Sequence, residues 1–284
     1  MIGVLNRLRW HADDRLRRGI HHHRFSVTDF ARIRRGLLVV AGRTVENDFS
    51  GKPRCLVGEV GIDLFAGQAK VKFEKALELN PNSSVAHYRY GFLYLAPLAR
   101  HDDAIREMKR ALELEPLSLI INANLAGAYM FAGQNDRALQ QARKTYDLEP
   151  NFVSGHYWLG LAYNANGMYA EAIALSERDL QTDSTNQYML RVAGYGYATS
   201  GRRREAEEVI KRFKDIAKTR YVMSYCVASI YAALGDKDNA FIELENAFVE
   251  RDFHLHRLKV DPVMNPLHDD PRFQDLMRRI GLPQ

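Results

Sequence analysis

The stretch Asp102–Pro116, DDAIREMKRALELEP, decides the fold, because variants of it recur along most of the chain. Its Ala104 has counterparts at intervals of 34 residues: Ala138, Ala172, Ala206 and Ala240. The same interval separates a series of glycines (Gly133, Gly167, Gly201, Gly235) and a series of tyrosines (Tyr129, Tyr163, Tyr197, Tyr231). A fixed period of this length indicates a solenoid of stacked units.

The spacing predicts two helices in each unit. The first helix ends near the glycine, which closes a last helical turn without steric cost, and the second helix runs from just before the alanine. Pro116 and Pro150 prevent the second helix from continuing. Tyr94 lies 35 residues before Tyr129, so we expect one extra residue in the turn Ala96–His101.

The pattern resembles the tetratricopeptide repeat over residues 69–252. Trp, Leu, Gly, Tyr, Ala and Pro of that repeat correspond here to His156, Leu159, Gly160, Tyr163, Ala172 and Ser184. The resemblance implies an all-α fold, a right-handed α-solenoid of antiparallel helix pairs with a C-terminal capping helix. We divide the chain into an atypical basic segment (1–65), a repeat array of a half-unit and five pairs (66–252), and a C-terminal connection with a capping helix (253–284).

The N-terminal segment differs from the array in charge. Residues 1–68 hold 12 Lys and Arg against 7 Asp and Glu, and this surplus accounts for the whole net charge of +5. The segment is either a solvated or poorly ordered leader or an arm that contacts nucleic acid through phosphates. Because the array starts with a half-unit, residues 1–65 are an ordered cap, the remnant of another domain, or an incorrectly called start.

The C-terminal tail has its own signals. His254–Val260 alternates weakly, which suggests an extended connection. Asp270 suits a helix N-cap, Pro271 the first helical position and Gly281 the residue after the end, so we expect a capping helix between them. The tail is similar to the closing segment of repeat regions fused to bacterial winged-helix activators, nucleotide cyclases and Ser/Thr kinases. It shares with them Tyr231–Asp238, Lys259–Pro262, Asn265–Leu267 and Asp270–Leu282.

Composition and motifs narrow the functional classes. No run of about 18 apolar residues is present, and two cysteines are too few for a disulfide scaffold, so we expect a cytoplasmic protein. Cys226 is expected to be a buried, reduced thiol. No motif for a nucleophile, a metal or a phosphate is found, so we expect no catalysis, no cofactor and no metal site. His87 and His156 occupy sites where the repeat usually has an aromatic residue, so we expect them to pack.

The expected function is protein binding in the concave groove that first helices line in such a stack. We predict that its binding residues are Tyr88, Phe92, Met130, Phe131, Tyr157, Asn164, Tyr188, Arg191 and Tyr195. Some of them, Phe92 and Met130 among these, have packing against the next helix as an alternative role. Some members of the repeat family that the chain resembles hold the C-terminal carboxylate of an acidic tail with a run of Lys, Arg and Asn. This groove lacks such a run, so an apolar helix or extended peptide is the expected ligand.

The alternative function is a regulatory module of a bacterial signalling or transcription regulator whose basic N-terminus contacts nucleic acid. The sequence does not distinguish the identity of a protein partner, the pathway or the oligomeric state.

Overall fold

A computed structural model describes residues 45–47, 53–55 and 68–282 of the chain, all within one compact unit that spans residues 43–284. The predictions for residues 1–65 therefore lie almost wholly outside the described residues. Two short strands, β1 (Val45–Asn47) and β2 (Pro53–Cys55), pair antiparallel with Val45 opposite Cys55 and Asn47 opposite Pro53.

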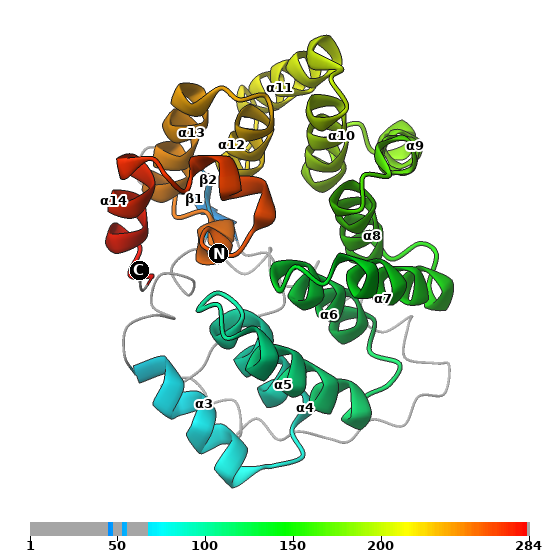
Figure 1. Cartoon of the computed structure of the whole chain (residues 1–284), viewed down its shortest axis with the longest axis vertical. Coiled ribbons are helices and arrows are strands. Elements are labelled where there is room, and N and C mark those ends of the chain that lie inside the picture. The colour runs from blue at the N-terminus through cyan, green and yellow to red at the C-terminus, as the bar shows by residue number, and fades with distance from the viewer. Residues whose placement is uncertain (1–44, 48–52, 56–67, 283–284) are drawn as a thin grey trace, which may run out of the picture. The chain divides into compact units, whose positions relative to one another are not determined.

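The rest of the described chain is helical and follows the predicted pairs (Figure 1). The first helices are α4 (Ser84–Arg89) with its continuation Tyr90–Leu95, α6 (Leu119–Phe131), α8 (Val153–Ala165), α10 (Gln187–Thr199) and α12 (Ser224–Ala233). The second helices are α3 (Gln68–Leu79), α5 (His101–Leu114), α7 (Asn135–Leu148), α9 (Tyr169–Thr182), α11 (Arg203–Ala217) and α13 (Lys237–Val249). The predicted half-unit and five pairs correspond to α3 and the pairs α4–α5 to α12–α13.

The four pairs from α6–α7 to α12–α13 turn at the expected glycine. Gly133, Gly167, Gly201 and Gly235 all have positive φ, between 69° and 81°, which is the left-handed conformation that glycine adopts without strain. The residue after each glycine donates its backbone N–H to the carbonyl of the periodic tyrosine, as Gln134 does to Tyr129. The glycine and tyrosine series of the sequence therefore mark one recurring helix end.

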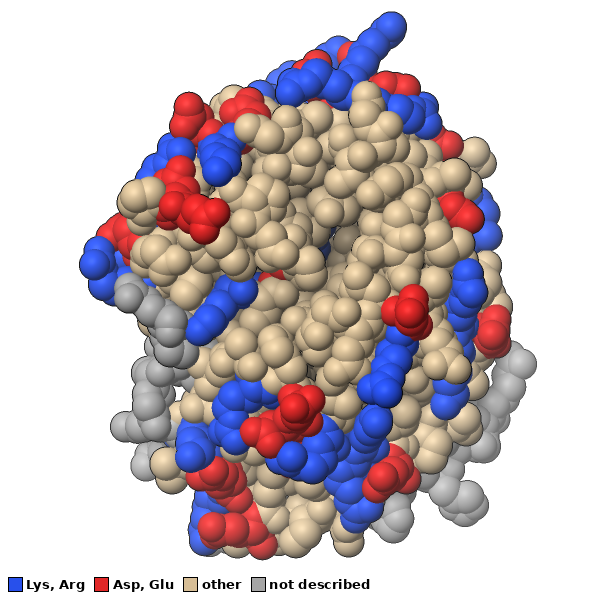
Figure 2. All heavy atoms as spheres, in the orientation of Figure 1, with Lys and Arg blue, Asp and Glu red and all other residues tan. Residues whose placement is uncertain are grey.

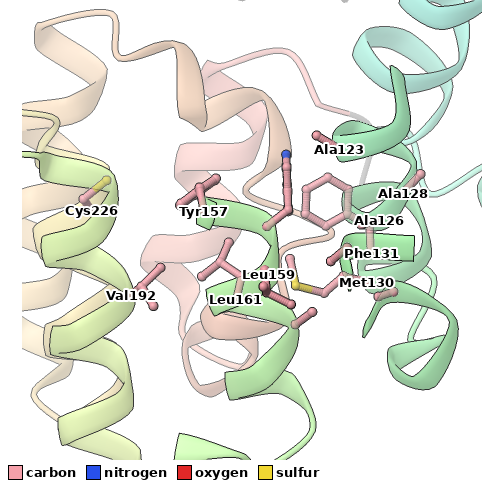
Figure 3. Packing of buried hydrophobic residues seen from close by; sticks show 14 of the residues in the cluster. Ala123, Ala126, Ala128, Met130, Phe131, Tyr157, Leu159, Leu161, Val192 and Cys226 are labelled. Carbon is pink, nitrogen blue, oxygen red and sulfur yellow. The ribbon is translucent and has the colours of Figure 1, made fainter. Parts of the chain in front are cut away.

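Small residues let successive first helices pack closely. A Cβ added at Gly160 in α8 would lie 2.5 Å from Cγ1 of Val192 in α10, and one at Gly127 in α6 would lie 2.5 Å from the ring of Trp158 in α8. Figure 3 shows the resulting core, with Met130 and Phe131 of α6, Leu159 and Leu161 of α8, and Val192 of α10. Cys226 lies in this core as a free, buried cysteine, as predicted.

The extra residue before Tyr129 lies in a helix and not in the turn. Tyr90–Leu95 is π-helical, and Ala96 donates to the carbonyl of Gly91, five residues back. The following turn has ordinary spacing, because Ala99 takes positive φ where the next unit has Gly133, and Arg100 donates to Leu95 as Gln134 does to Tyr129. The expectation of a longer turn was therefore wrong, since a π-helical turn absorbs the insertion.

Beyond α13 the chain forms two 3₁₀-helices, η2 (Phe253–Arg257) and η3 (Pro262–Leu267), and then α14 (Pro271–Arg279). The extended connection expected at His254–Val260 was wrong, because Asp252 accepts the backbone N–H of His254 and starts a helical turn. The C-terminal helix has its predicted signals: the Asp270 side chain accepts the N–H of Arg272, and Gly281 has a φ of 78°. A second core joins α12 and α13 to η2, η3 and α14 through Leu255, Met264, Phe273 and their neighbours.

Candidate functional site

The predicted groove residues come from four first helices, α4 with its continuation, α6, α8 and α10, and most of them are buried. Tyr88, Tyr188 and Tyr195 are partly exposed. The other six are no more than 6% exposed: Phe92, Met130, Phe131, Tyr157, Asn164 and Arg191. These six do not lie on an open surface in this structure, and the contacts that bury them fall into two groups.

In the N-terminal half, aromatic side chains pack across three first helices. The ring centroids of Phe92 and Phe131 are 6.0 Å apart, and Trp158 of α8 packs edge-on to both at 5.9 and 5.8 Å. Phe92 and Phe131 therefore take the alternative role of packing against the next helix. Met130 is buried in the same core.

A chain of hydrogen bonds supports this aromatic group. Trp158 Nε1 donates to Asn124 Oδ1 at 2.8 Å, and Asn124 Nδ2 donates to the Tyr88 hydroxyl at 2.9 Å. Burial raises the pKa of Tyr88, which keeps its hydroxyl protonated. Trp158 and Asn124 were not among the residues predicted from the sequence. The signal for this packing is a small residue in one first helix, Gly127, and a large residue in the next first helix, Trp158.

Asn164 also points into a helix contact. Its Nδ2 donates to the carbonyl of Val192 in α10 at 3.0 Å, and its Oδ1 is buried against Gly196. The side chain therefore joins α8 to α10 and is not directed towards a ligand.

In the C-terminal half, the 3₁₀ segment 253–267 covers the predicted groove residues. Arg191 is fully buried, and its Nη2 lies 2.6 Å from Asp261 Oδ2 just before η3. The same guanidinium donates through Nε to Ser229 Oγ at 3.1 Å and through Nη1 to the Tyr157 hydroxyl. Tyr225, in turn, donates its hydroxyl to Asp261 at 3.1 Å.

A second arginine comes from the covering segment itself. Arg257 Nη2 donates to the Tyr157 hydroxyl at 2.7 Å, and its Nε lies 3.6 Å from Asp261 Oδ2. Although burial alone would raise the pKa of Asp261, Arg191 and Arg257 hold it below its usual range. The closed half of the groove is thus a buried polar network, and sequence distances of 70 and 100 residues separate its partners.

Two histidines of the covering segment are also buried. His254 Nδ1 lies 2.7 Å from Asp252 Oδ1, and its ring packs edge-on to Tyr188 at 5.8 Å. His256 Nδ1 donates to the carbonyl of Phe253 at 2.6 Å, while its buried Nε2 has no hydrogen-bond partner among the described residues. Burial lowers the pKa of His254, and it lowers that of His256 to about 3, so both are neutral near pH 7.

His87 and His156 have matching structural roles. His87 bonds Glu107 Oε2 in α5 at 2.6 Å and the carbonyl of Pro81 at 2.9 Å. His156 bonds Asp179 in α9 and the carbonyl of Pro150. Each ring thus ties the start of a first helix to the preceding loop and to its own second helix.

The described residues hold no group of three or more His, Cys, Asp or Glu side chains placed to bind a metal ion. Within the same residues, none of the helices has the length and apolar character needed to cross a bilayer. In the view of Figure 2, uncharged side chains surround a hollow near the middle of the face, and charged side chains lie at its margin and across its lower half.

Comparisons with known proteins agree with this architecture. A family model described as tetratricopeptide repeat matches residues 72–106. The small glutamine-rich tetratricopeptide repeat-containing protein 2 of Mycosarcoma maydis is 30% identical over 86 residues, and the STIP1 homolog of Dictyostelium discoideum is 27% identical over 124 residues. The matches cover 30% and 43% of this chain but only 24% and 22% of those relatives.

Solved structures resemble the fold at low identity. The type IV pilus biogenesis factor PilW superposes with a TM-score of 0.50 and 15% identity over 78% of this chain and 97% of its own. A chain from the APC/C hetero-tetramer Cut9–Hcn1 superposes with a TM-score of 0.51 and 12% identity, over 79% of this chain and 47% of that one. These likenesses bear on the fold alone.

Proposed function

We propose that the chain is a tetratricopeptide repeat protein that acts as a non-catalytic protein-interaction module and binds a peptide or helix of a partner in the open part of its concave surface. We place it in the cytoplasm. The matched region spans only about a quarter of the length of these relatives. Their activities and partners are therefore not assigned to this chain.

One observation carries the proposal. Tyr88 on α4 and Tyr188 and Tyr195 on α10 keep partly exposed side chains while most of their neighbours are buried. Tyrosine is favoured at binding hot spots, because a rigid apolar ring ends in a hydroxyl that can form a hydrogen bond. We therefore narrow the predicted groove to these three tyrosines and leave out Tyr157 and Arg191, whose surfaces residues 253–267 already cover.

The test is partner capture from a lysate of the source organism with the full chain, beside a Tyr88→Ala, Tyr195→Ala double variant. A partly exposed tyrosine on a second helix, Tyr146, provides the control as Tyr146→Ala. We expect a partner that the native chain and the control retain and the double variant loses. Equal retention by all three would contradict the groove as the binding site.

A finer assignment concerns the resemblance to repeat regions of bacterial activators, cyclases and kinases. None of the relatives described above is such a protein, so a regulatory role with nucleic-acid contact remains the alternative proposal. The observation that favours it is the surplus of basic residues in 1–68, a segment mostly outside the described residues. Binding to DNA that weakens steeply with salt and disappears when residues 1–65 are deleted would support it.

A further inference from the structure

Exposed apolar side chains gather along one edge of the array. Because the helices alternate in direction, every second helix ends and the next first helix begins at this edge. We call its first three segments, residues 77–86, 111–121 and 145–154, the loop edge. Of nine exposed large apolar side chains in the described part of the chain, six belong to the loop edge: Leu79, Val85, Leu117, Ile120, Leu148 and Val153.

These side chains are well exposed, from 40% for Leu148 to 77% for Leu117. Val85 and Ile120 occupy corresponding positions of successive first helices, and Leu117 lies one turn before Ile120. The later loops of the same edge, 183–186 and 218–223, contribute none of the nine. Apart from Val249 near the end of α13, the exposed large apolar side chains at this edge therefore lie in its first three segments, towards the N-terminal side of the described array.

The loop edge also has one sign of charge. Its three segments contain five carboxylates (Glu78, Glu113, Glu115, Asp147 and Glu149) and neither Lys nor Arg. Lys75 and Arg110, from just outside it, pair with Glu78 at 2.8 Å and Glu113 at 3.0 Å. Glu115 accepts from Ser84 Oγ and Glu149 from the backbone of Asn151, and within the described chain no ion pair reaches these two or Asp147.

We propose that the loop edge is a docking surface for a basic amphipathic segment of a partner protein. Apolar side chains of that segment cover Leu117, Ile120 and Val153, and its Lys or Arg side chains meet the unpaired carboxylates. Apolar burial supplies the binding free energy, while charge complementarity selects basic segments over acidic ones. The inference rests on the proposed function and names a second surface and the chemistry of its occupant.

The test uses defined peptides and the full chain. The probe is a fluorescent amphipathic helix of Leu and Lys, about five turns long, measured by anisotropy beside a Leu/Glu helix and a Ser/Lys peptide of the same length. The edge variants are Leu117→Ser with Val153→Ser, and Asp147→Lys. Matched controls are Ile242→Ser, an exposed apolar side chain on α13, and Glu208→Lys, an exposed carboxylate on α11.

We expect the Leu/Lys helix to bind at least about tenfold more tightly than either comparison peptide. Each edge variant weakens the binding of the Leu/Lys helix by about fivefold or more. Both control variants bind this helix as the native chain does, and the thermal midpoints of all variants stay unchanged. Equal binding of the Leu/Glu helix, or an equal loss in Ile242→Ser, overturns the proposal. Concentration-dependent self-association that the edge variants abolish also overturns it, because the occupant is then a second copy. Binding that the edge variants leave intact and Tyr88→Ala, Tyr195→Ala removes refutes the loop edge while it supports the groove.

Discussion

At the scale of single residues, Arg191 carries a large cost of burial, because its charged guanidinium has no exposed surface. Its charge is balanced by Asp261 at 2.6 Å, and Tyr157 and Ser229 accept its remaining hydrogen bonds. We predict that Arg191→Ala lowers the free energy of unfolding by about 3–5 kcal/mol, since the variant leaves a buried carboxylate with less compensation. Urea denaturation followed by circular dichroism measures the loss.

The control for this prediction is Arg202→Ala. Arg202 pairs with Glu205 at 2.9 Å, but both side chains are more than 40% exposed, so its loss should lower the free energy of unfolding much less than the loss of Arg191. Similar midpoints for the two variants would show that the buried network contributes no more than a surface pair.

His256 makes the stability of the C-terminal region depend on pH. Burial lowers its pKa from 6.5 to about 3, so between these values the unfolded chain binds one proton more than the folded chain. Stability is therefore full above pH 6.5 and falls by about 1.4 kcal/mol per pH unit as the pH decreases towards 3. The lowered pKa values of Asp252 and Asp261 add a separate loss only below about pH 3.8.

The measurement is a series of urea midpoints between pH 7.5 and 4.5 for the native chain and for His256→Asn. Asparagine keeps a donor for the Phe253 carbonyl but does not titrate. We expect a shallower pH dependence in the variant. His254 titrates in the same direction, because burial lowers its pKa as well, so some dependence persists. Parallel curves for the two proteins would refute the role of His256.

At the scale of elements, the π-helical turn Tyr90–Leu95 shows how the array accommodates an extra residue. Residues before the turn keep a spacing of 35 to the next unit, and residues after it keep a spacing of 34. The insertion therefore leaves Phe92 packed against Phe131 and still places Leu95 at the helix end. One wide, strained turn takes up the extra residue, so the rest of the helix keeps its register with its neighbours.

Deletion of Leu93 should consequently restore a regular α-helix. Leu93 is only partly buried, and its removal gives the first pair the period of the others. We predict a folded protein whose free energy of unfolding changes by no more than about 1 kcal/mol. Deletion of Ala162 from the regular helix α8 is the control, and it should unfold that unit because it rotates the following core residues. A similar loss in both deletions, measured by urea denaturation, would contradict this account.

The period of 34 residues was enough to predict the helix pairs, because it repeats the local signals of each helix end and each close approach. The C-terminal helix lies outside the period, but local signals predicted it, since Asp270, Pro271 and Gly281 act within a few residues of where they stand. Neither the period nor a local signal predicted that residues 253–267 cover Tyr157 and Arg191. That contact joins residues 100 positions apart, and no local pattern in residues 253–267 shows where the segment packs.

At the scale of the whole described array, the C-terminal residues serve as a cap that also closes part of the concave surface. Terminal units of solenoids need such a cap, because each unit is stabilised mainly by its neighbours. Here the cap does more than cover α13: Leu255, Leu258 and Met264 are buried against α12 and α13, and Asp261 reaches back to α10. The units from α10 to α13 should therefore depend on it much more than those from α4 to α7.

A chain that ends at Asp252 tests this dependence. We predict a lower unfolding midpoint and fast amide exchange in α10–α13, because truncation exposes Tyr225 and removes the carboxylate of Asp261 that pairs with Arg191. Exchange in α6 and α7 should change little, since units far from the lost cap keep their neighbours. Hydrogen exchange by mass spectrometry reports each region in the same sample. Uniform loss of protection along the array would show instead that it unfolds as a single cooperative unit, and unchanged protection in α10–α13 would show that the cap does not stabilise them.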